Sequence, residues 1–310
     1  MIRPLALLAF IMPLMWDADR FNASTRKPGG TIALTLLLLA LQAPALAHTG
    51  GSGSSWRSTS GGYKVTWTHS DLRAVPLSAP DKIVFSAKRL AREEFTRDQD
   101  AKNHLATETR SFDLLSLTGT IMSYEDRRQG NILDSHPYGE TKIVAINLKR
   151  GGLPAKLTDI FFPEDVFNAL INDKVIQKAL EQVGSQPTDL DQLLRAFGDG
   201  VEVETEATGH SGPLCFKISR DFLTQFAFHH IDKDKVWVRI GLSGTPKCRY
   251  ECTELGITLP VPQMLQLELE AADSGKSGML MKDSETHAKL INTTVALDAS
   301  KPPKRTASAQ

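Results

Sequence analysis

Three cysteines are the residues of this sequence best suited to covalent chemistry. Cys248 and Cys252 stand close together in the turn-like segment KCRYEC, and Cys215 lies on an expected strand. In an oxidising compartment two of them are expected to form a disulfide, with Cys248–Cys252 slightly preferred and Cys215 as a partner for either. The alternatives are free thiols, or a zinc site that also uses a histidine, although the spacing matches no standard zinc finger.

The histidines and carboxylates form no recognisable catalytic or metal-binding motif. His229 and His230 are adjacent, so on a strand they are expected to face opposite sides and not to chelate one metal ion. The sequence contains neither the H-E-x-x-H motif of zinc proteases nor the G-x-S-x-G motif of serine hydrolases. We therefore expect no metal site, no cofactor and no catalytic residues, and a protein that is not an enzyme.

The N-terminal region predicts export. Residues 31–42, TIALTLLLLALQ, form an apolar run that is too short to span a bilayer comfortably, with Arg26 and Lys27 before it and the small residues Ala45 and Ala47 after it. Residues 1–47 are thus expected to be a signal peptide, and Met15 is an alternative start within it. The protein is expected to be periplasmic or secreted, with membrane attachment only through an uncleaved signal.

The charge of the remaining chain argues against a nucleic-acid partner. Removal of residues 1–47 leaves 32 basic and 34 acidic residues, a formal net charge of −2. Proteins that bind the phosphate backbone need a strongly basic surface, which this balance does not provide.

The pattern of apolar residues predicts an α+β fold in which an antiparallel sheet packs with a few helices. Strands are expected at residues 63–68, 112–125 (bulged at Gly119), 142–148, 201–206, 214–218, 222–228, 235–242 and 255–259. Helices are expected at residues 81–95, from Pro163 through Ala179, from Thr188 or Asp189 to Gly198, and after Pro262 through Ala272.

These elements are expected to divide the chain into four parts after the signal. They are a flexible Gly/Ser lead at residues 48–62, an N-terminal α/β portion at 63–125, a second portion at 126–272 and a polar, partly disordered tail at 273–310.

Three segments of the chain resemble a family of extracytoplasmic domains. They are residues 123–140 (SYEDRRQGNILDSHPYGE), residues 157–161 (LTDIF) at the start of a helix, and the late segment ITLPVP at 257–262. Together they resemble the domain of unknown function found in RsiV-type anti-sigma factors and beside some peptidoglycan deacetylases, over roughly residues 110–270. The family's loop carries a Gly-Gly pair before its His-Pro, whereas this chain has Asp134 and Ser135.

The resemblance implies a binding or sensing protein of the cell envelope whose partner is a lysozyme-like protein or peptidoglycan. It places the binding residues in the loop at 126–140, and we expect Asp134, His136 and Tyr138 to contribute. Residues 1–30 offer no sigma-binding segment, so the resemblance favours envelope binding over an anti-sigma role. The alternative function is a periplasmic hydrolase with a site near His136.

Cleavage of the signal is expected between Ala47 and His48, because Ala45-Leu46-Ala47 has the small-x-small pattern that follows the apolar region of a signal peptide. N-terminal sequencing of the exported protein should start at His48. A membrane-bound product that retains residues 31–47 would contradict this prediction.

Overall fold

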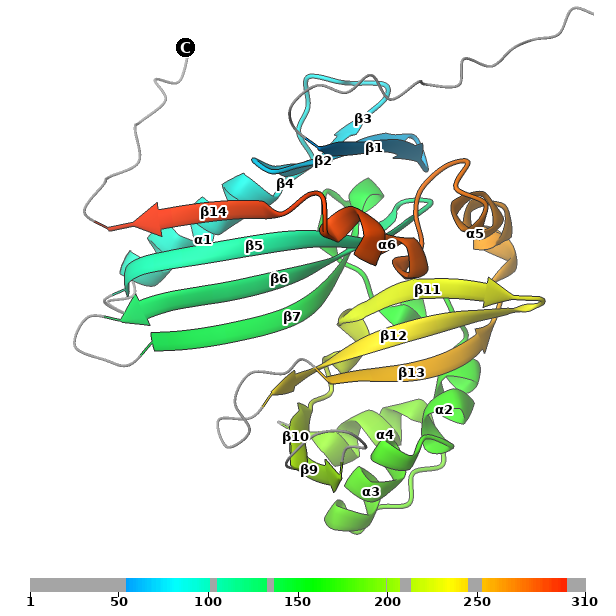
Figure 1. Cartoon of the computed structure of the whole chain (residues 1–310). Helices are drawn as coiled ribbons and strands as arrows, with labels where there is room; N and C mark the ends of the chain where they lie inside the picture. The colour runs from blue at the N-terminus through cyan, green and yellow to red at the C-terminus, as the bar shows by residue number, and fades with distance from the viewer. Residues whose placement is uncertain are drawn as a thin grey trace, which may run out of the picture. The chain divides into compact units, whose positions relative to one another are not determined.

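The described part of the chain has an α+β fold with antiparallel sheets, as the sequence predicts. The computed structural model describes residues 54–100, 105–132, 137–198, 200–206, 213–244 and 253–299 (Figure 1). Over these residues the chain forms three sheets and six α-helices, and none of these helices is long and apolar enough to cross a membrane.

The N-terminal sheet is a four-stranded antiparallel meander. Its strands, in spatial order, are β1 (Ser55–Ser60), β2 (Tyr63–Thr68), β3 (Leu72–Pro76) and β4 (Phe85–Ser86). Strand β1 lies inside the segment 48–62 that was assigned to a flexible lead, so that expectation is wrong for residues 55–60. Pairing with the alternating apolar strand β2 orders this Gly/Ser-rich segment.

The central sheet contains the two longest strands of the described residues, β5 (Leu105–Thr118) and β6 (Ile121–Ile132). Its order is β14 (Thr293–Asp298), β5, β6, β7 (Pro137–Asn147) and β8 (Leu153–Pro154). The expected bulged strand at 112–125 is instead a tight hairpin. Gly119 has a φ of +56° there, and Thr118 pairs with Ile121 across the turn.

The third sheet is covered by helices. Strand β12 (Lys235–Gly244) pairs with three neighbours, namely β11 (Phe226–Asp232), β13 (Thr253–Pro260) and β10 (Pro213–Ile218), and β10 pairs in turn with β9 (Val201–Glu206). The expected strand at 222–228 begins later, because Phe222–Thr224 forms a short 3-10 turn.

The six helices are α1 (Ala87–Asp100), α2 (Pro163–Ile171), α3 (Lys174–Val183), α4 (Leu190–Phe197), α5 (Gln266–Asp273) and α6 (Met281–Ala288). Helix α1 starts six residues later than expected, because Phe85 pairs with Ala74 of β3 and the Ser86 hydroxyl accepts the backbone N–H of Arg89. The helix expected from Pro163 through Ala179 is two helices, because Asp173 caps a new one.

The expected division of the chain also changes. The boundary proposed between residues 125 and 126 falls inside β6, and the described residues belong to one compact unit. The tail expected from Asp273 contains helix α6 and strand β14, which pairs with β5 over its whole length. Only its last residues, 300–310, fall outside the described part.

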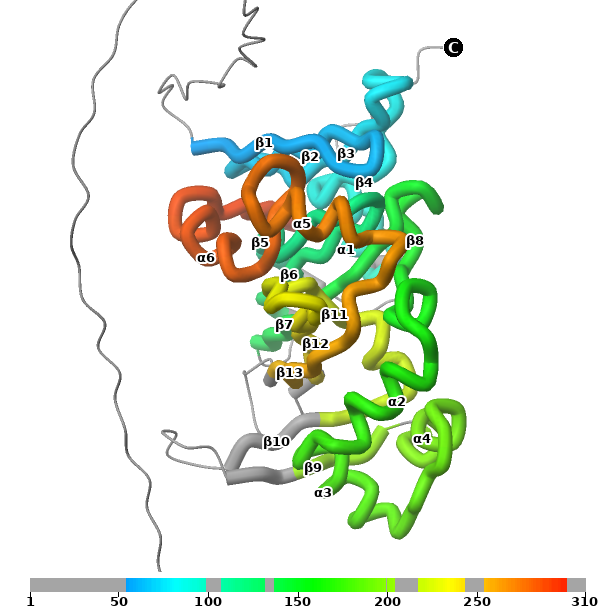
Figure 2. The backbone as a smooth tube through the Cα atoms, turned by 90° about the vertical axis from the view of Figure 1, so that its right-hand side faces the viewer, coloured from blue at the N-terminus to red at the C-terminus, as the bar shows by residue number. Residues whose placement is uncertain are grey.

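Both faces of the central sheet are buried by other layers (Figure 2). One face packs Phe112, Leu114 and Tyr124 into a core shared with α1 and the N-terminal sheet. The other face contributes Ile121 and Ala145 to a larger core shared with the third sheet and helices α2–α5. The strands β5, β6 and β7 therefore lie between two cores, one on each face of the sheet.

A buried ion network holds α1 against the central sheet. Arg110 of β5 is fully buried, and its Nε donates to Asp126 Oδ1 of β6 at 3.1 Å. Its Nη1 donates to Glu94 Oε2 of α1 at 2.6 Å. A buried charge is tolerated only when it is paired and hydrogen bonded. The burial of Arg110 therefore requires the carboxylates of Asp126 and Glu94 beside it.

Loss of Arg110 should destabilise the fold strongly. In Arg110→Ala the Asp126 carboxylate, which is 1% exposed, loses its cation, so the free energy of unfolding should fall by about 3–5 kcal/mol. Urea denaturation of the purified protein measures this change. The double variant Arg110→Met/Asp126→Leu removes both charges of this pair and should recover most of the lost stability. A loss below about 1 kcal/mol in Arg110→Ala would contradict the role of the network.

Candidate functional site

Tyr138, the described member of the predicted binding triad, is held within the fold. It lies on β7 opposite Gly130 of β6, and its ring covers that glycine so closely that a Cβ there would lie 2.6 Å from Tyr138 Cε1. The ring crosses β6, and the Tyr138 hydroxyl donates to Glu108 Oε2 of β5 at 2.6 Å. Partial burial and this hydrogen bond raise the pKa of Tyr138 well above its ordinary value.

The Glu108 carboxylate that Tyr138 reaches also accepts a hydrogen bond from Arg128 Nη2 at 2.9 Å. Arg128 reaches Asp98 of α1 at 3.0 Å as well, so these groups extend the ion network described above. The contacts of the Tyr138 hydroxyl are thus structural, and a role in binding stays a prediction. Asp134 and His136, the other two predicted residues, lie outside the described residues.

The cysteine and metal predictions are tested only in part. Cys248 and Cys252 lie outside the described residues, and of Cys215 the structure describes the backbone, which pairs with Glu204 of β9. The proposed disulfide therefore stays a prediction. Among the described residues, no group of three or more His, Cys, Asp or Glu side chains is arranged to hold a metal ion.

His229 and His230 do not face opposite sides as a regular strand would require. The register of β11 against β12 shifts between Phe228 and His230, and this irregularity brings the two Nδ1 atoms to 2.7 Å. The His230 ring stacks on Trp237 of β12 with a centroid distance of 5.3 Å. Burial, assisted by nearby Arg239, lowers the pKa of His229, so its neutral form is favoured.

A group of carboxylates lies on the face of the central sheet that looks toward the third sheet. Asp113 of β5 and Glu125 of β6 are direct neighbours across the strands, and both pair with the guanidinium of Arg127, at 2.8 Å for Asp113. Asp113 Oδ1 is buried and has no hydrogen-bond partner. Burial raises the pKa of Asp113, Glu125 and Glu254 of β13 above the ordinary values for these carboxyl groups.

Raised carboxyl pKa values are a property that acid–base catalysts use. Here, however, Arg127 pairs with both Asp113 and Glu125, and these residues line neither the cavity at Trp56 nor the groove along α3. These carboxylates therefore affect the stability of the fold, and they line neither of these two cavities.

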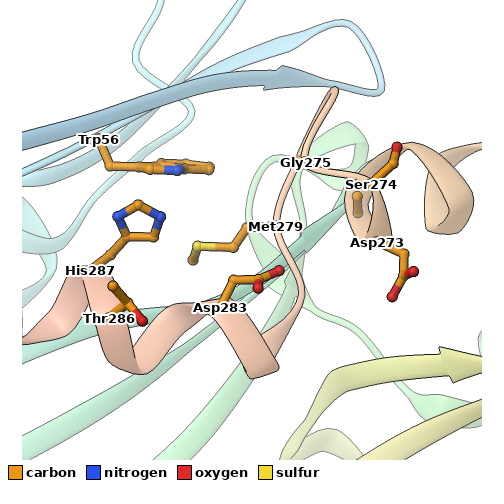
Figure 3. Close-up of a pocket in the computed structure, with 10 residues that line it drawn as sticks. Trp56, Asp273, Ser274, Gly275, Met279, Asp283, Thr286 and His287 are labelled. Carbon is orange, nitrogen blue, oxygen red and sulfur yellow. The ribbon is translucent and has the colours of Figure 1, made fainter. Parts of the chain in front are cut away.

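A cavity of about 390 Å³ lies where β1, the α5–α6 connection and α6 meet (Figure 3). Its chemically capable lining residues come from segments far apart in the sequence: Trp56, Asp273, Ser274, Asp283, Thr286 and His287. Met279, which is buried, also lines it. In Figure 3 the indole of Trp56 lies across the top, with His287 below it and Asp283 beside Met279.

Trp56 is held in place by the core beneath it. It pairs with Trp67 of β2, which is completely buried, and it packs against the same hydrophobic cluster. The Trp56 and His287 ring centroids are 6.3 Å apart with the planes inclined by 56°, so the rings meet at an angle and do not stack. Strand β1 thereby presents one aromatic ring to the cavity.

The α5–α6 connection is docked on β5 by backbone hydrogen bonds. Leu117 and Met279 exchange two of them, at 2.8 and 3.0 Å. Gly278, which precedes Met279 in this connection, has a φ of +82°. A Cβ there would lie 2.2 Å from the Leu117 carbonyl oxygen, so only glycine fits. The Gly278 N–H also donates to Ser58 Oγ of β1 at 2.8 Å, which ties the connection to the strand that carries Trp56.

Helix α6 is oriented by a buried hydrogen bond from Ser284 Oγ to the Leu114 carbonyl at 2.6 Å. Asp283 and His287 are four residues apart and therefore lie on one face of α6, which lines the cavity. Lys282 extends from the same helix to Asp273 Oδ1 at 2.6 Å and links α6 to the end of α5. The cavity thus has an aromatic face, an imidazole, two carboxylates and hydroxyl groups.

A second, wider groove of about 800 Å³ runs along α3 and the turn that follows it. Its lining includes Ile171, Leu180 and Pro187, with Glu181 as the charged residue. Its polar lining residues, Gln177, Glu181, Ser185 and Gln186, include one carboxylate and no aromatic ring, so the cavity at Trp56 is the stronger candidate for a ligand with both polar and apolar surfaces.

Sequence reasoning missed the cavity because both of its walls come from segments that look unstructured. Trp56 stands in the Gly/Ser-rich lead, and Asp273, Asp283 and His287 stand in the polar tail. The available signal was the tryptophan itself, because a large aromatic side chain is unusual in a flexible linker.

The carboxylates around Arg127 make stability depend on pH in a defined direction. A carboxyl whose pKa is raised by folding stabilises the protein fully below its unfolded pKa, and this contribution is lost as the pH rises through the folded pKa. Asp113→Asn removes the titration, so the variant's free energy of unfolding relative to wild type should be higher at about pH 7 than at about pH 4. Urea denaturation at both pH values measures it, with the exposed Asp234→Asn as control. An equal difference at the two pH values would refute the assignment.

Comparison of the chain with protein-family models, with curated proteins and with solved structures finds no match.

Proposed function

We propose that this protein is an exported, non-catalytic binding protein of the cell envelope and that the cavity at Trp56 binds a saccharide of the wall. The observation that carries the proposal is the combination of an aromatic face, carboxylates, hydroxyl groups and an imidazole around one cavity of about 390 Å³. This volume lies within the range of about 300–1,000 Å³ that is usual for ligand sites.

A sugar ring has the two kinds of surface that this lining matches. Its axial C–H groups form an apolar face that packs on an aromatic ring, and Trp56 offers such a ring at the edge of the cavity. Its hydroxyl groups both donate and accept hydrogen bonds. The carboxylates of Asp273 and Asp283 accept such bonds, while the Thr286 and Ser274 hydroxyls do both.

The sequence supports the location of such a ligand. The predicted signal at residues 1–47 directs the chain to the envelope, and the resemblance of residues 110–270 to an RsiV-type domain implies binding of a wall component or a lysozyme-like protein. The wall saccharide is the partner that the cavity favours, because a cavity of this size accepts a small polar group more readily than a protein surface. Binding of a lysozyme-like protein at the loop 126–140 is the other candidate partner from the resemblance.

The proposal predicts that Trp56→Ala weakens saccharide binding. Loss of an aromatic anchor typically costs about 2 kcal/mol or more, which corresponds to roughly thirtyfold weaker binding. Calorimetry of the exported protein with soluble wall oligosaccharides measures the effect, and chromatography of the same mixtures tests for hydrolysis.

Trp237→Ala is the matched control, because Trp237 is 37% exposed and packs on His230 of the third sheet, outside the cavity lining. Thermal unfolding of all variants ensures that they are folded. Wild-type protein that binds no wall oligosaccharide at millimolar concentration would refute the proposal, and so would a Trp56→Ala variant that binds like wild type. Cleavage of the oligosaccharides would favour the hydrolase alternative.

A further inference from the structure

We infer that the saccharide bound at Trp56 carries a free ammonium group, as in an amino sugar that lacks its N-acetyl group. This inference rests on the proposed function and adds the chemical class of the ligand. The observation behind it is an uncompensated carboxylate, that of Asp283, placed in the same cavity as an indole face.

Acidic side chains line the cavity, whereas Lys and Arg side chains do not. Its lining contains two carboxylates and no Lys or Arg side chain. Asp273 is already paired, because Lys282 Nζ contacts its Oδ1 at 2.6 Å from outside the cavity lining. Asp283, by contrast, has no side-chain hydrogen bond or ion pair with any residue of the described part. The negative charge that a ligand meets is therefore that of Asp283.

The position of Asp283 in the helix does not use up its carboxylate. It stands in the first turn of α6, where an acidic residue is favourable to the helix dipole, but α6 begins without any side-chain capping hydrogen bond. The Ser284 hydroxyl donates to the Leu114 carbonyl and so fixes the orientation of α6 about its axis. In this orientation Asp283 lines the cavity. Both oxygens of the carboxylate can accept hydrogen bonds from a ligand.

An ammonium group satisfies this lining better than a neutral amide. It donates charge-assisted hydrogen bonds to a carboxylate, which are roughly twice as strong as neutral ones. Cations are also attracted to the face of an indole, and Trp56 forms one side of the same cavity. N-acetylation removes the positive charge and adds bulk, so it removes both contributions.

The experiment compares oligomers of glucosamine with N-acetylglucosamine oligomers of equal length by calorimetry on the exported protein. Wild type should bind the glucosamine oligomer at least tenfold more tightly. Asp283→Asn should reduce the preference to less than about twofold, chiefly by weakening the glucosamine complex. Glu285→Gln is the matched control, because it removes a carboxylate of the same helix that does not line the cavity, and it should keep the preference.

The outcomes separate this inference from the proposed function. If wild type binds both oligomers equally, the ammonium inference is wrong and saccharide binding stands. If it binds neither, both are wrong. A preference that survives Asp283→Asn would show that the ammonium is recognised elsewhere. A wall stem peptide with a free side-chain amine is the third ligand, and tighter binding of this peptide than of both oligomers would overturn the assignment to an amino sugar.

Discussion

The β5–β6–β7 meander is buried on both faces, and the layers on either side of it are arranged around this burial. A sheet that is covered on both sides needs a layer of matching apolar side chains above and below it. Phe112 and Tyr124 face the N-terminal sheet and α1, while Ile121 and Ala145 face the third sheet. The charged residues on these strands must then be neutralised inside the protein, which Arg110 does for Asp126 on one face.

The cavity at Trp56 forms where the two ends of the described chain meet beside this sheet. Strand β14 pairs with β5, and the Leu117–Met279 bridge brings the start of α6 to the same strand. Strand β1 reaches the connection through Ser58, whose Oγ accepts from Gly278. Since each contact is made over long sequence distances, the aromatic and acidic walls of the cavity come together only in the complete fold. A change that breaks the contacts of either end would therefore disrupt the cavity and also lower the stability of the fold.

Carboxylates paired with an arginine and the unpaired carboxylate of Asp283 have different roles in the described part of the chain. Around Arg110 and Arg127 each carboxylate lies beside a guanidinium, so these charges are paired within the protein. Asp283 has no such partner in the described part and lines a cavity. An unpaired charge costs little where it is partly solvated, and it remains available for a ligand. This difference is the physical basis for placing the binding function at Trp56 and Asp283, away from the larger ion networks.

Elements with local signals can be predicted from the order of the residues alone. The apolar alternation of residues 63–68 and 235–242 predicts β2 and β12, and Asp189 and Gly198 mark the two ends of α4. Other features depend on contacts between distant parts of the chain. Strand β1 forms because β2 pairs with it, β14 forms because β5 offers a free edge, and the irregular register of β11 turns His229 and His230 toward each other. The Tyr138 ring lies across Gly130 of β6 and its hydroxyl reaches Glu108 of β5. No local pattern in the sequence indicates this contact between β7 and β5. Periodicity and capping depend on neighbours within a few residues, whereas strand pairing and the cavity depend on contacts between residues as distant as Trp56 and His287.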